Sequence, residues 1–486
     1  MITATQPVEC KTVMCRLHYR KLNTDADLSA LSEVISKLPD AAILGGNPSK
    51  TEADGFSYWM PRPVDVFEFR TGQKTPFEKL QATLTKYRLA DNVSDNLPGG
   101  IFTCGWVGCF SYDLGRYIEP AAFAGDSVSR DDLSLPLIRL CFYDRLIAYD
   151  HSQKAFWLIA LEFEDDAETP QQKLSYLAGL LDRAEAVRTP APPPADIENI
   201  DFAQIQSNMT KDYYLKAFDK IKRHIYDGDV YQINFSQRFD YVYHARPIGL
   251  FHWQNRYNPS PYSAYIDAGS FQIVSASPEM FITIRDRVIS TKPIKGTRKR
   301  YEEASTAAGR LNAEHLRQLL SSEKEKAELN MIIDLERNDI ARVSKPGTRK
   351  VTQPRTIETY PTVFHAVATV SGELRDNVNF CDILKAMFPG GSITGAPKIR
   401  SMQIIDEIEP TARGIYTGSI GFIGLDGSVC LNIAIRTIII KNNTAYVQTG
   451  GGIVADSDSK AEYEETITKA RALLSGIQAV PNRQNP

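Results

Sequence analysis

Strand-like and helix-like patterns are interspersed along this chain without regular alternation, and this feature constrains the fold more than any other. From Val230 to Phe239, polar and apolar residues alternate with nearly strict period two, which is typical of a strand with one polar face. Long segments with helical periodicity follow at Thr306–Leu320, Ser322–Leu335 and Ser459–Leu474. Because folds with parallel sheets require a regular succession of strands and helices, we predict an α+β fold with large, mostly antiparallel sheets flanked by helices.

A further strand signal lies near the C-terminus. Cys430–Ile440 and Ala445–Gln448 are rich in apolar and β-branched residues and flank Asn442-Asn443. Asparagine tolerates the left-handed backbone of a tight turn, so we predict a hairpin around this pair.

A proline-rich segment, Thr189–Asp196, separates two helical patterns at Gln171–Val187 and Lys211–Tyr226. Proline cannot continue a helix or a central strand, so the segment is expected to be extended. We predict an N-terminal region over residues 1–188, a linker over 189–200 and a catalytic domain over 201–480. A surface loop within one continuous fold is the alternative, because such loops can have the same composition.

Charge and composition exclude several classes of protein. The chain carries 56 Lys+Arg against 59 Asp+Glu, a formal charge of −3, which argues against a nucleic-acid-binding surface. No window approaches the roughly 18 apolar residues of a membrane span, and the N-terminus does not resemble a secretory signal. Seven cysteines, an odd number in a long chain, fit a reducing compartment better than a disulfide framework, so we expect a cytoplasmic protein.

Two of the helical segments carry pairs of acidic residues. Glu325 and Glu328 are three residues apart, as are Glu462 and Glu465, so each pair lies on one helix face. If the two helices converge, the four carboxylates would suit Mg2+, which prefers oxygen ligands. Lys469 lies one turn beyond Glu465 and could pair with it or bind an anion. Solvated helix faces are the alternative, since charged pairs with this spacing are common there.

Two glycine-rich stretches could expose backbone amides to an anionic ligand. Thr449–Ile453 contains three successive glycines between a predicted strand and a predicted helix. Pro389–Lys398 resembles a phosphate-binding loop, but Ala396 stands where that motif requires lysine. Tight turns are the alternative interpretation of both stretches.

Lys295 and Glu279 are candidates for a nucleophile and a general acid. Lys295 follows a strand-like run, and burial of its amine would lower the pKa and free the lone pair. Glu279 lies sixteen residues earlier, after Ser277-Pro278. A surface ammonium and a solvated carboxylate are the alternatives, and these residues alone favour them. His365, in an apolar run, resembles a core histidine more than a catalyst when judged from these residues alone.

Taken together, the segments from about Met209 to Leu474 resemble the chorismate-utilising enzymes. This family includes anthranilate synthase large subunits, aminodeoxychorismate synthase component I, and isochorismate and salicylate synthases. The matching blocks occur in the family's order: DGDVYQINFSQRF (227–239), SASPE (275–279), KPIKGT (292–297), AELNMIIDLERND (327–339), FPGGSITGAPK (388–398), GSIGF (418–422), IAIRT (433–437), GGGIVADS (450–457) and AEYEETITKA (461–470). The N-terminal GCFSYDLGR (108–116) is also similar to the family.

The resemblance implies a fold and a set of site residues. The fold would be the two-sheet sandwich of anthranilate synthase component I. Glu328 and Glu465 would be the main Mg2+ ligands, with Glu325 and Glu462 beside them. Catalytic roles would fall to Lys295, Glu279 and His365, so that for His365 the resemblance outweighs the core interpretation. The substrate site would be lined by Gly296, Thr297, Ser392, Tyr416, Arg436, Gly450, Gly451, Gly452 and Lys469.

Within the family, the residue at position 295 distinguishes the members. Aminodeoxychorismate synthases have P-I-K-G-T, as here, whereas anthranilate synthases have alanine at the lysine position. Isochorismate and salicylate synthases place a lysine base where this chain has Gln232. The resemblance therefore implies synthesis of 4-amino-4-deoxychorismate, a precursor of p-aminobenzoate and folate, through attack of Lys295 on C2 and protonation of the departing C4 hydroxyl by Glu279. An anthranilate synthase with an unusual lysine and a non-catalytic scaffold are the alternatives.

The source of nitrogen and the regulation follow from the same comparison. No cysteine lies in a G-x-C-x-G nucleophile context, so ammonia would come from a separate glutamine amidotransferase subunit. The family's tryptophan pocket uses an L-L-E-S motif and an N-P-S-P-Y-M stretch. Asn258–Ser263 keeps most of the second, but Ile43–Gly46 lacks the Glu-Ser pair of the first, so we do not expect inhibition by tryptophan.

Overall fold

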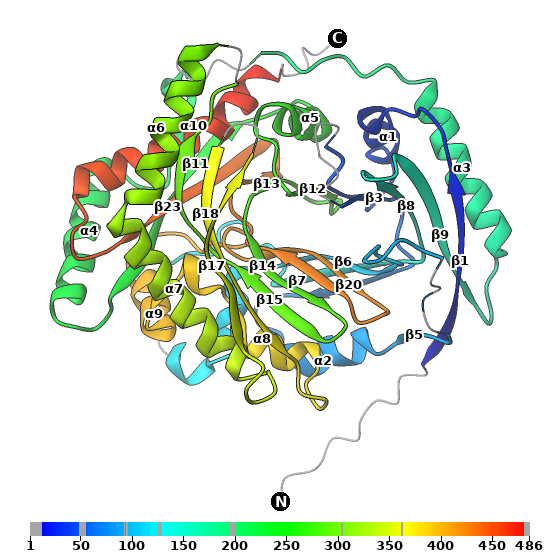
Figure 1. The fold of residues 1–486 in the computed structure, drawn as a ribbon, viewed down its shortest axis with the longest axis horizontal. Helices are drawn as coiled ribbons and strands as arrows, with labels where there is room; N and C mark the ends of the chain where they lie inside the picture. The colour runs from blue at the N-terminus through cyan, green and yellow to red at the C-terminus, as the bar shows by residue number, and fades with distance from the viewer. Residues whose placement is uncertain are drawn as a thin grey trace, which may run out of the picture.

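The computed structural model describes residues 12–47, 55–91, 93, 96–123, 129–194, 200–302, 305–360 and 363–480. These residues form two large β-sheets that pack against each other, with helices on the outside (Figure 1). The prediction of an α+β fold with mostly antiparallel sheets is confirmed.

The first sheet has 13 strands and contains the first and the last strand of the described chain, β1 and β23. Among the described strands, only β1 and β5 pair in parallel. In spatial order the strands are β10 (Gln206–Ser207), β11 (Gln232–Val242), β23 (Thr444–Ile453), β22 (Thr437–Lys441), β13 (Gln272–Ser277), β12 (Tyr262–Asp267), β2 (Ala42–Leu44), β3 (Phe56–Met60), β8 (Arg145–Asp150), β9 (Ala155–Phe163), β1 (Val13–Leu22) and β5 (Tyr87–Leu89), with β19 (Gly395–Ala396) beside β11.

The second sheet has 10 strands, and its β16 edge carries the lysine motif. In spatial order the strands are β16 (Ile294–Lys299), β18 (Val363–Glu373), β15 (Val288–Lys292), β14 (Met280–Arg285), β21 (Val429–Asn432), β20 (Ser419–Gly424), β6 (Gly105–Phe110), β7 (Ile138–Tyr143) and β4 (Asp65–Phe69), with β17 (Lys350–Thr359) also paired to β18.

The helices cover the outer faces and the open end of the sandwich (Figure 1). They are α1 (Leu28–Ile35), α2 (Pro76–Leu84), α3 (Pro170–Glu185), α4 (Lys211–Tyr226), α5 (Pro247–Tyr257), α6 (Thr306–Ser321), α7 (Glu323–Ala341), α8 (Phe380–Met387), α9 (Lys398–Ile408) and α10 (Ser459–Ala479), with short 3-10 turns η2 (Tyr112–Tyr117), η3 (Pro120–Phe123), η4 (Phe202–Gln204) and η5 (Gly391–Ile393).

Buried apolar side chains form separate cores on the two faces of the first sheet. The larger core lies between the sheets and joins Leu161 of β9 to Trp106 and Phe142 of the second sheet. A second core lies under α1, α3, α5 and α10 and includes Leu177 and Phe251. Both faces of the first sheet are covered, so folding removes the apolar side chains on each face from water. Most strands in the centre of this sheet are therefore apolar along their whole length.

The C-terminal strand prediction is correct in one part and wrong in another. Asn442 and Asn443 have φ of 51° and 58° and connect β22 to β23, which confirms the hairpin. The single strand predicted over Cys430–Ile440 is wrong, because the chain leaves the second sheet after Asn432 and enters the first sheet at Thr437. The apolar pattern continues through this crossing, so the local sequence carries no signal for it.

Each sheet contains strands from before and from after the proline-rich segment. In the first sheet β12 pairs with β2, and in the second sheet β20 pairs with β6, so strands from either side of residues 189–200 are hydrogen-bonded together. The division predicted there therefore does not coincide with a division between sheets. Residues 189–194 form neither helix nor strand, and 195–199 lie outside the described residues.

Two further observations concern the protein's environment. Among the described residues no disulfide forms between Cys15, Cys104, Cys109, Cys141, Cys381 and Cys430, and Cys10 lies outside the described residues. Throughout the described ranges, no helix is both long enough and apolar enough to span a bilayer.

Candidate active site

Lys295 lies on β16, at the edge of the second sheet, where Glu279 also reaches it. The neighbouring charges that affect the pKa of Lys295 are those of Glu279, Glu328, Lys469 and Glu465. The structure therefore brings the lysine motif, the SASPE block and both acid-bearing helices together. This convergence was predicted from the sequence only as one of two interpretations of each motif.

Burial shifts the pKa of Lys295 and the pKa of Glu279 in opposite directions. Burial lowers the pKa of Lys295, and the opposing attraction of Glu279 and Glu328 does not cancel this effect. Burial also raises the pKa of Glu279, which is only 6% exposed. Since a low-dielectric environment disfavours both charges, the pair shifts from ammonium and carboxylate towards neutral amine and carboxylic acid. These are the forms that a nucleophile and a general acid require.

Ser392, predicted to line the substrate site, contacts Glu279. The Ser392 hydroxyl on η5 donates to Glu279 Oε1 at 2.6 Å, and both side chains are buried. The backbone of η5 is bound by Glu336, whose Oε1 accepts from the Gly391 N–H at 3.2 Å. Sequence analysis missed Glu336, although it lies within the matching AELNMIIDLERND block. The signal that could have identified it is an acidic residue on the apolar side of a helix.

His365 and Thr297 face each other across paired strands. Thr297 on β16 is in register with His365 on β18, and the hydroxyl oxygen lies 2.8 Å from His365 Nδ1. Burial, with a smaller contribution from the charge of Arg436, lowers the pKa of His365 to about 3. The imidazole is therefore neutral near pH 7 and can act through hydrogen bonds, not as a cation.

Arg436 is a desolvated cation without an anionic partner among the described residues. It lies in the crossing between β21 and β22 with φ of 49°, and burial lowers its pKa with no carboxylate to oppose the effect. Within the described part of the chain, the guanidinium has no hydrogen bond or ion pair. Arg436 is half-buried, and a partly desolvated guanidinium without a partner is stabilised when a ligand supplies negative charge, so this position fits a carboxylate-bearing substrate.

The glycines of β23 pair with β11, and their lack of side chains lets the two strands lie close together. Gly450 is in register with Ser236, and a Cβ at Gly450 would lie 2.6 Å from the Phe235 carbonyl oxygen. Lys469 on α10 donates to the Gly450 carbonyl at 2.9 Å and pairs with Glu465 at 2.7 Å. Tyr416, also predicted here, is buried at 7% exposure.

The remaining predicted residues, Gly296, Gly451 and Gly452, have polar side chains close to where a Cβ would lie. A Cβ at Gly296 would lie 2.9 Å from Glu325 Oε2, one at Gly451 would lie 3.0 Å from Glu462 Oε2, and one at Gly452 would lie 3.1 Å from Gln232 Nε2. Two of these three glycines therefore adjoin the predicted metal-binding carboxylates.

The four predicted metal ligands adjoin the site but are held by protein partners. Within the residues that the structure describes, no group of three or more His, Cys, Asp or Glu side chains is arranged to hold a metal ion. The partners are Arg298 for Glu325 (2.7 Å), Lys324 for Glu328 (4.0 Å), Ser457 for Glu462 (2.7 Å) and Lys469 for Glu465 (2.7 Å).

Two observations nevertheless fit a cation at these carboxylates. Glu325 Oε2 is buried without a hydrogen-bond partner. Burial, together with the charge of Glu465, raises the pKa of Glu462, whereas Lys469 outweighs burial at Glu465 and lowers its pKa. An oxygen without a partner and a carboxyl group near a like charge are both stabilised by an added cation, and oxygen-only ligands suit Mg2+.

Comparison with known proteins agrees with this geometry. Residues 48–475 match the model of a family described as chorismate binding enzyme. The chain is 39% identical over 380 residues to aminodeoxychorismate synthase component 1 of Bacillus subtilis (strain 168), covering 78% of this chain and 77% of the relative. It is 38% identical over 437 residues to an anthranilate synthase component 1 of Haloarcula marismortui, covering 88% and 86%.

The fold is also shared with a solved structure. The crystal structure of anthranilate synthase component I from Streptococcus pneumoniae TIGR4 superimposes with a TM-score of 0.69 at 30% identity, covering 86% of this chain and 92% of the other. The predicted two-sheet architecture of this type is thereby confirmed. Relatives with two different activities match at nearly equal identity, so identity alone does not distinguish between the two reactions.

Proposed function

We propose that this chain, which belongs to the chorismate-binding enzyme family, converts chorismate and ammonia to 4-amino-4-deoxychorismate. The observation that carries the proposal is Lys295, a half-buried residue whose amine has a lowered pKa, beside the buried acid Glu279. Anthranilate formation does not need a nucleophilic side chain at this position. A covalent route through C2 does need one.

The proposed reaction proceeds in two displacements. The neutral Lys295 amine attacks C2 of chorismate, the ring double bonds shift, and the C4 hydroxyl departs as water with the proton of Glu279. Ammonia then attacks C4, the double bonds shift back, and Lys295 leaves as a neutral amine. The new C4 ammonium returns a proton to the Glu279 carboxylate. Covalent catalysis divides one difficult substitution into two easier steps.

The other residues of the site bind and orient the substrate in this proposal. Arg436 would pair with a substrate carboxylate through a forked, charge-assisted contact, and neutral His365 with Thr297 would hydrogen-bond a polar substituent. Glu328 and Glu465, with Glu325 and Glu462, would hold Mg2+, which when bound supplies positive charge to a second carboxylate. The acidic side chains alone would repel a dianionic substrate.

Ammonia is proposed to come from a glutamine amidotransferase subunit. The relatives are named as component 1 of their enzymes, which implies a second component in those proteins. We expect weak glutamine-dependent activity from this chain alone, and strong activity without a partner would contradict the proposal. We further propose a reducing, cytoplasmic location, which the six free thiols support.

A product assay tests the proposed reaction directly. The purified chain is incubated with chorismate, Mg2+ and ammonium, with and without an added aminodeoxychorismate lyase, and the products are identified by mass. We expect a non-aromatic amine that yields p-aminobenzoate only with the lyase. Anthranilate and pyruvate would support the second candidate function, anthranilate synthesis, which the nearly equal identity to anthranilate synthases favours. Absence of Mg2+-dependent chorismate binding would indicate a non-catalytic scaffold.

The Lys295→Ala variant tests the covalent route separately. The proposal predicts loss of ammonia-dependent product formation with chorismate binding retained. Unchanged product and rate would show that Lys295 is not the nucleophile, even if the overall reaction is correct.

A further inference from the structure

The short turn η5 carries Ser392 at its middle and thereby controls a contact of the proposed general acid. The Ser392 hydroxyl donates to Glu279 Oε1 at 2.6 Å, so a shift of η5 would break this hydrogen bond. The turn lies directly against α7, since a Cβ at Gly391 would lie 3.1 Å from Glu336 Oε1 and overlap the Leu335 side chain. Whatever fixes η5 on α7 therefore also fixes Ser392 on Glu279.

Two buried side chains bind the backbone of η5 on either side of Ser392. The Gly391 N–H donates to Glu336 Oε1 at 3.2 Å, and the Ile393 carbonyl accepts from Arg413 Nη1 at 2.9 Å. Glu336 is 3% exposed, and within the described part of the chain its Oε2 has no hydrogen-bond partner. Its contact with the turn is thus the one hydrogen bond that the Glu336 side chain makes among the described residues.

The charged groups around Glu336 are Asp339 on the same helix, Lys398 on α9 and Glu279. Lys398 pairs with Asp339 at 2.6 Å. Burial, with the charge of Asp339, raises the pKa of Glu336 to about 8, against the effects of Lys398 and the Gly391 amide. Near pH 7 the side chain is therefore largely a neutral acid that acts on η5 as a hydrogen-bond acceptor. A buried carboxyl group costs more than an apolar side chain of the same size, so a role for its single contact is expected.

The groups around Glu279 show how a shift of η5 would reach the reaction. Its pKa is lowered by the Ser392 hydroxyl, by the charges of Lys295 and Lys469 and by the Ile294 amide, against the larger effect of burial. Of these four groups, Ser392 alone lies on η5. The turn therefore affects Glu279 through the Ser392 hydroxyl.

We propose that Glu336 is a positioning residue, which binds the Gly391 amide and thereby keeps the Ser392 hydroxyl on Glu279. This inference rests on the proposed function, in which Glu279 is the general acid. Glu336 itself contacts no reacting atom, and its effect passes through η5.

Comparison of Glu336→Met with Glu336→Gln in the full chain tests the proposal. Both variants remove the ionisable group, but only glutamine keeps an oxygen that can accept from the Gly391 amide. A general acid produces a limb in the pH profile of kcat/KM for chorismate, measured at a fixed concentration of free ammonia. We expect the limb that reports Glu279 to lie about 0.5–1 pH unit higher in Glu336→Met than in Glu336→Gln, because a displaced Ser392 stabilises the carboxylate less.

The same two substitutions are then combined with Ser392→Ala. If Glu336 acts through Ser392, the two double variants should share one limb. Equal limbs of the two single variants would overturn the proposal, as would a difference that persists without the Ser392 hydroxyl. If Ser392→Ala moves a limb while the Glu336 variants do not differ, this inference fails alone. If Ser392→Ala moves neither limb, the general-acid role of Glu279 fails with it.

A control on the same helix separates positioning from loss of stability. Ile340 is fully buried on α7 and packs beside Gly372 of β18. Ile340→Ala should lower the melting temperature and leave the limb in place. A movement as large as that of Glu336→Met would show that any damage to α7 moves the limb, and would overturn the proposal. If Glu336→Met does not fold, Glu336→Asp replaces it, since the shorter side chain withdraws the acceptor from Gly391. An unmoved limb in Glu336→Asp would equally overturn the proposal.

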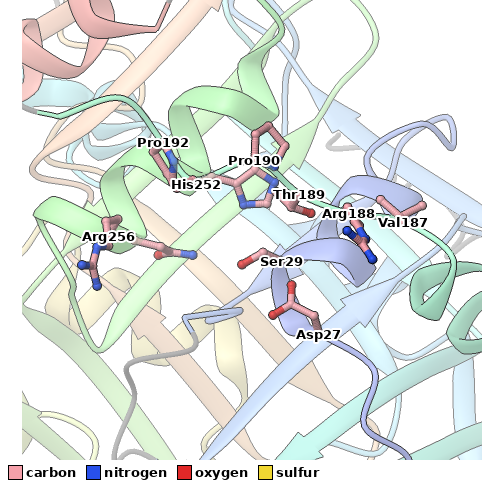
Figure 2. Close-up of a pocket in the computed structure, with 11 residues that line it drawn as sticks. Asp27, Ser29, Val187, Arg188, Thr189, Pro190, Pro192, His252 and Arg256 are labelled. Atoms are coloured by element: carbon pink, nitrogen blue, oxygen red, sulfur yellow. The ribbon is translucent and has the colours of Figure 1, made fainter.

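A second control tests the effect of net charge. Arg256 is exposed and lines a pocket between the start of α1, residues 187–192 and α5, and no residue of the candidate active site lines this pocket (Figure 2). Arg256→Gln changes the charge of the chain by one and should leave both limbs in place. A shift equal to that of Glu336→Met would show a general electrostatic effect and contradict the role of η5.

Discussion

Removing the Ser392 hydroxyl should raise the pKa of Glu279 and move one limb of the pH–rate profile. Ser392 donates to Glu279 Oε1 at 2.6 Å, and this bond lowers the carboxyl pKa against the larger effect of burial. A hydrogen bond to a charged group is worth roughly 1.5–3 kcal/mol, and one pKa unit corresponds to about 1.4 kcal/mol. In Ser392→Ala, the pKa of Glu279 should therefore rise by about one to two units.

The direction of the change follows from the role of Glu279. A general acid must be protonated at the start of the reaction, so activity is present below its pKa and is lost as pH rises through it. Ser392→Ala should shift the limb of kcat/KM for chorismate that reports Glu279 upwards by about one to two pH units. The limb that reports deprotonation of Lys295 should move much less.

The assay measures kcat/KM for chorismate across pH at a fixed concentration of free ammonia, with the lyase coupled to product formation. Ser392→Thr keeps a hydroxyl and should restore the original limb. Ser419→Ala is the matched control, since this buried hydroxyl donates to the Asn432 carbonyl at 2.6 Å, and it should leave the profile unchanged. A folded Ser392→Ala variant in which neither limb moves would refute the assignment of a limb to Glu279.

Three further predictions concern stability. Burial raises the pKa of Glu336 to about 8, so the folded protein holds this proton at a pH where the unfolded chain has lost it. The free energy of unfolding of the wild type should therefore fall as pH rises from about 4.5 to 8, by up to about 1.4 kcal/mol per pH unit. Urea titrations at each pH should show no such fall for Glu336→Gln. Arg413 pairs with Glu409 at 2.8 Å with both side chains buried, so Arg413→Met should lower the free energy of unfolding by about 3–5 kcal/mol, and a loss below about 1 kcal/mol would contradict the argument. Gly450→Ala would place a Cβ 2.6 Å from a carbonyl oxygen of β11 and should lower the melting temperature, whereas Gly309→Ala, with open space around it in α6, should raise it slightly.

Local signals were sufficient for α4, although α2, α5, α8 and α9 were not predicted. The predicted helix at Lys211–Tyr226 has the observed bounds of α4, because Thr210 caps its first turn and Gly228 follows its end. Capping and apolar periodicity act over a few residues, so they can be identified in a single segment.

The crossing at residues 433–436 could not be predicted in the same way. Ile433, Ala434 and Ile435 continue the apolar pattern of a strand, but they connect β21 in one sheet to β22 in the other. Which strand pairs with which is decided by partners that are distant in sequence, such as β14 for β21 and β13 for β22. The position of Arg436 in this connection, and hence its lack of a partner among the residues that the structure describes, was therefore inaccessible from the sequence pattern.

The same limit explains what could be predicted of the site. The residue types at 279 and 295 indicated an acid and an amine, but their protonation depends on desolvation by residues far away in sequence. Ser392 reaches Glu279 across 113 residues, and Lys295 is enclosed by charges from α7 and α10. If the sheets did not bury both groups, attraction between them would favour the ion pair, which is inactive as nucleophile and acid. Desolvation by the sandwich is thus the property that connects this fold to the proposed chemistry, and the pH–rate profile measures it directly.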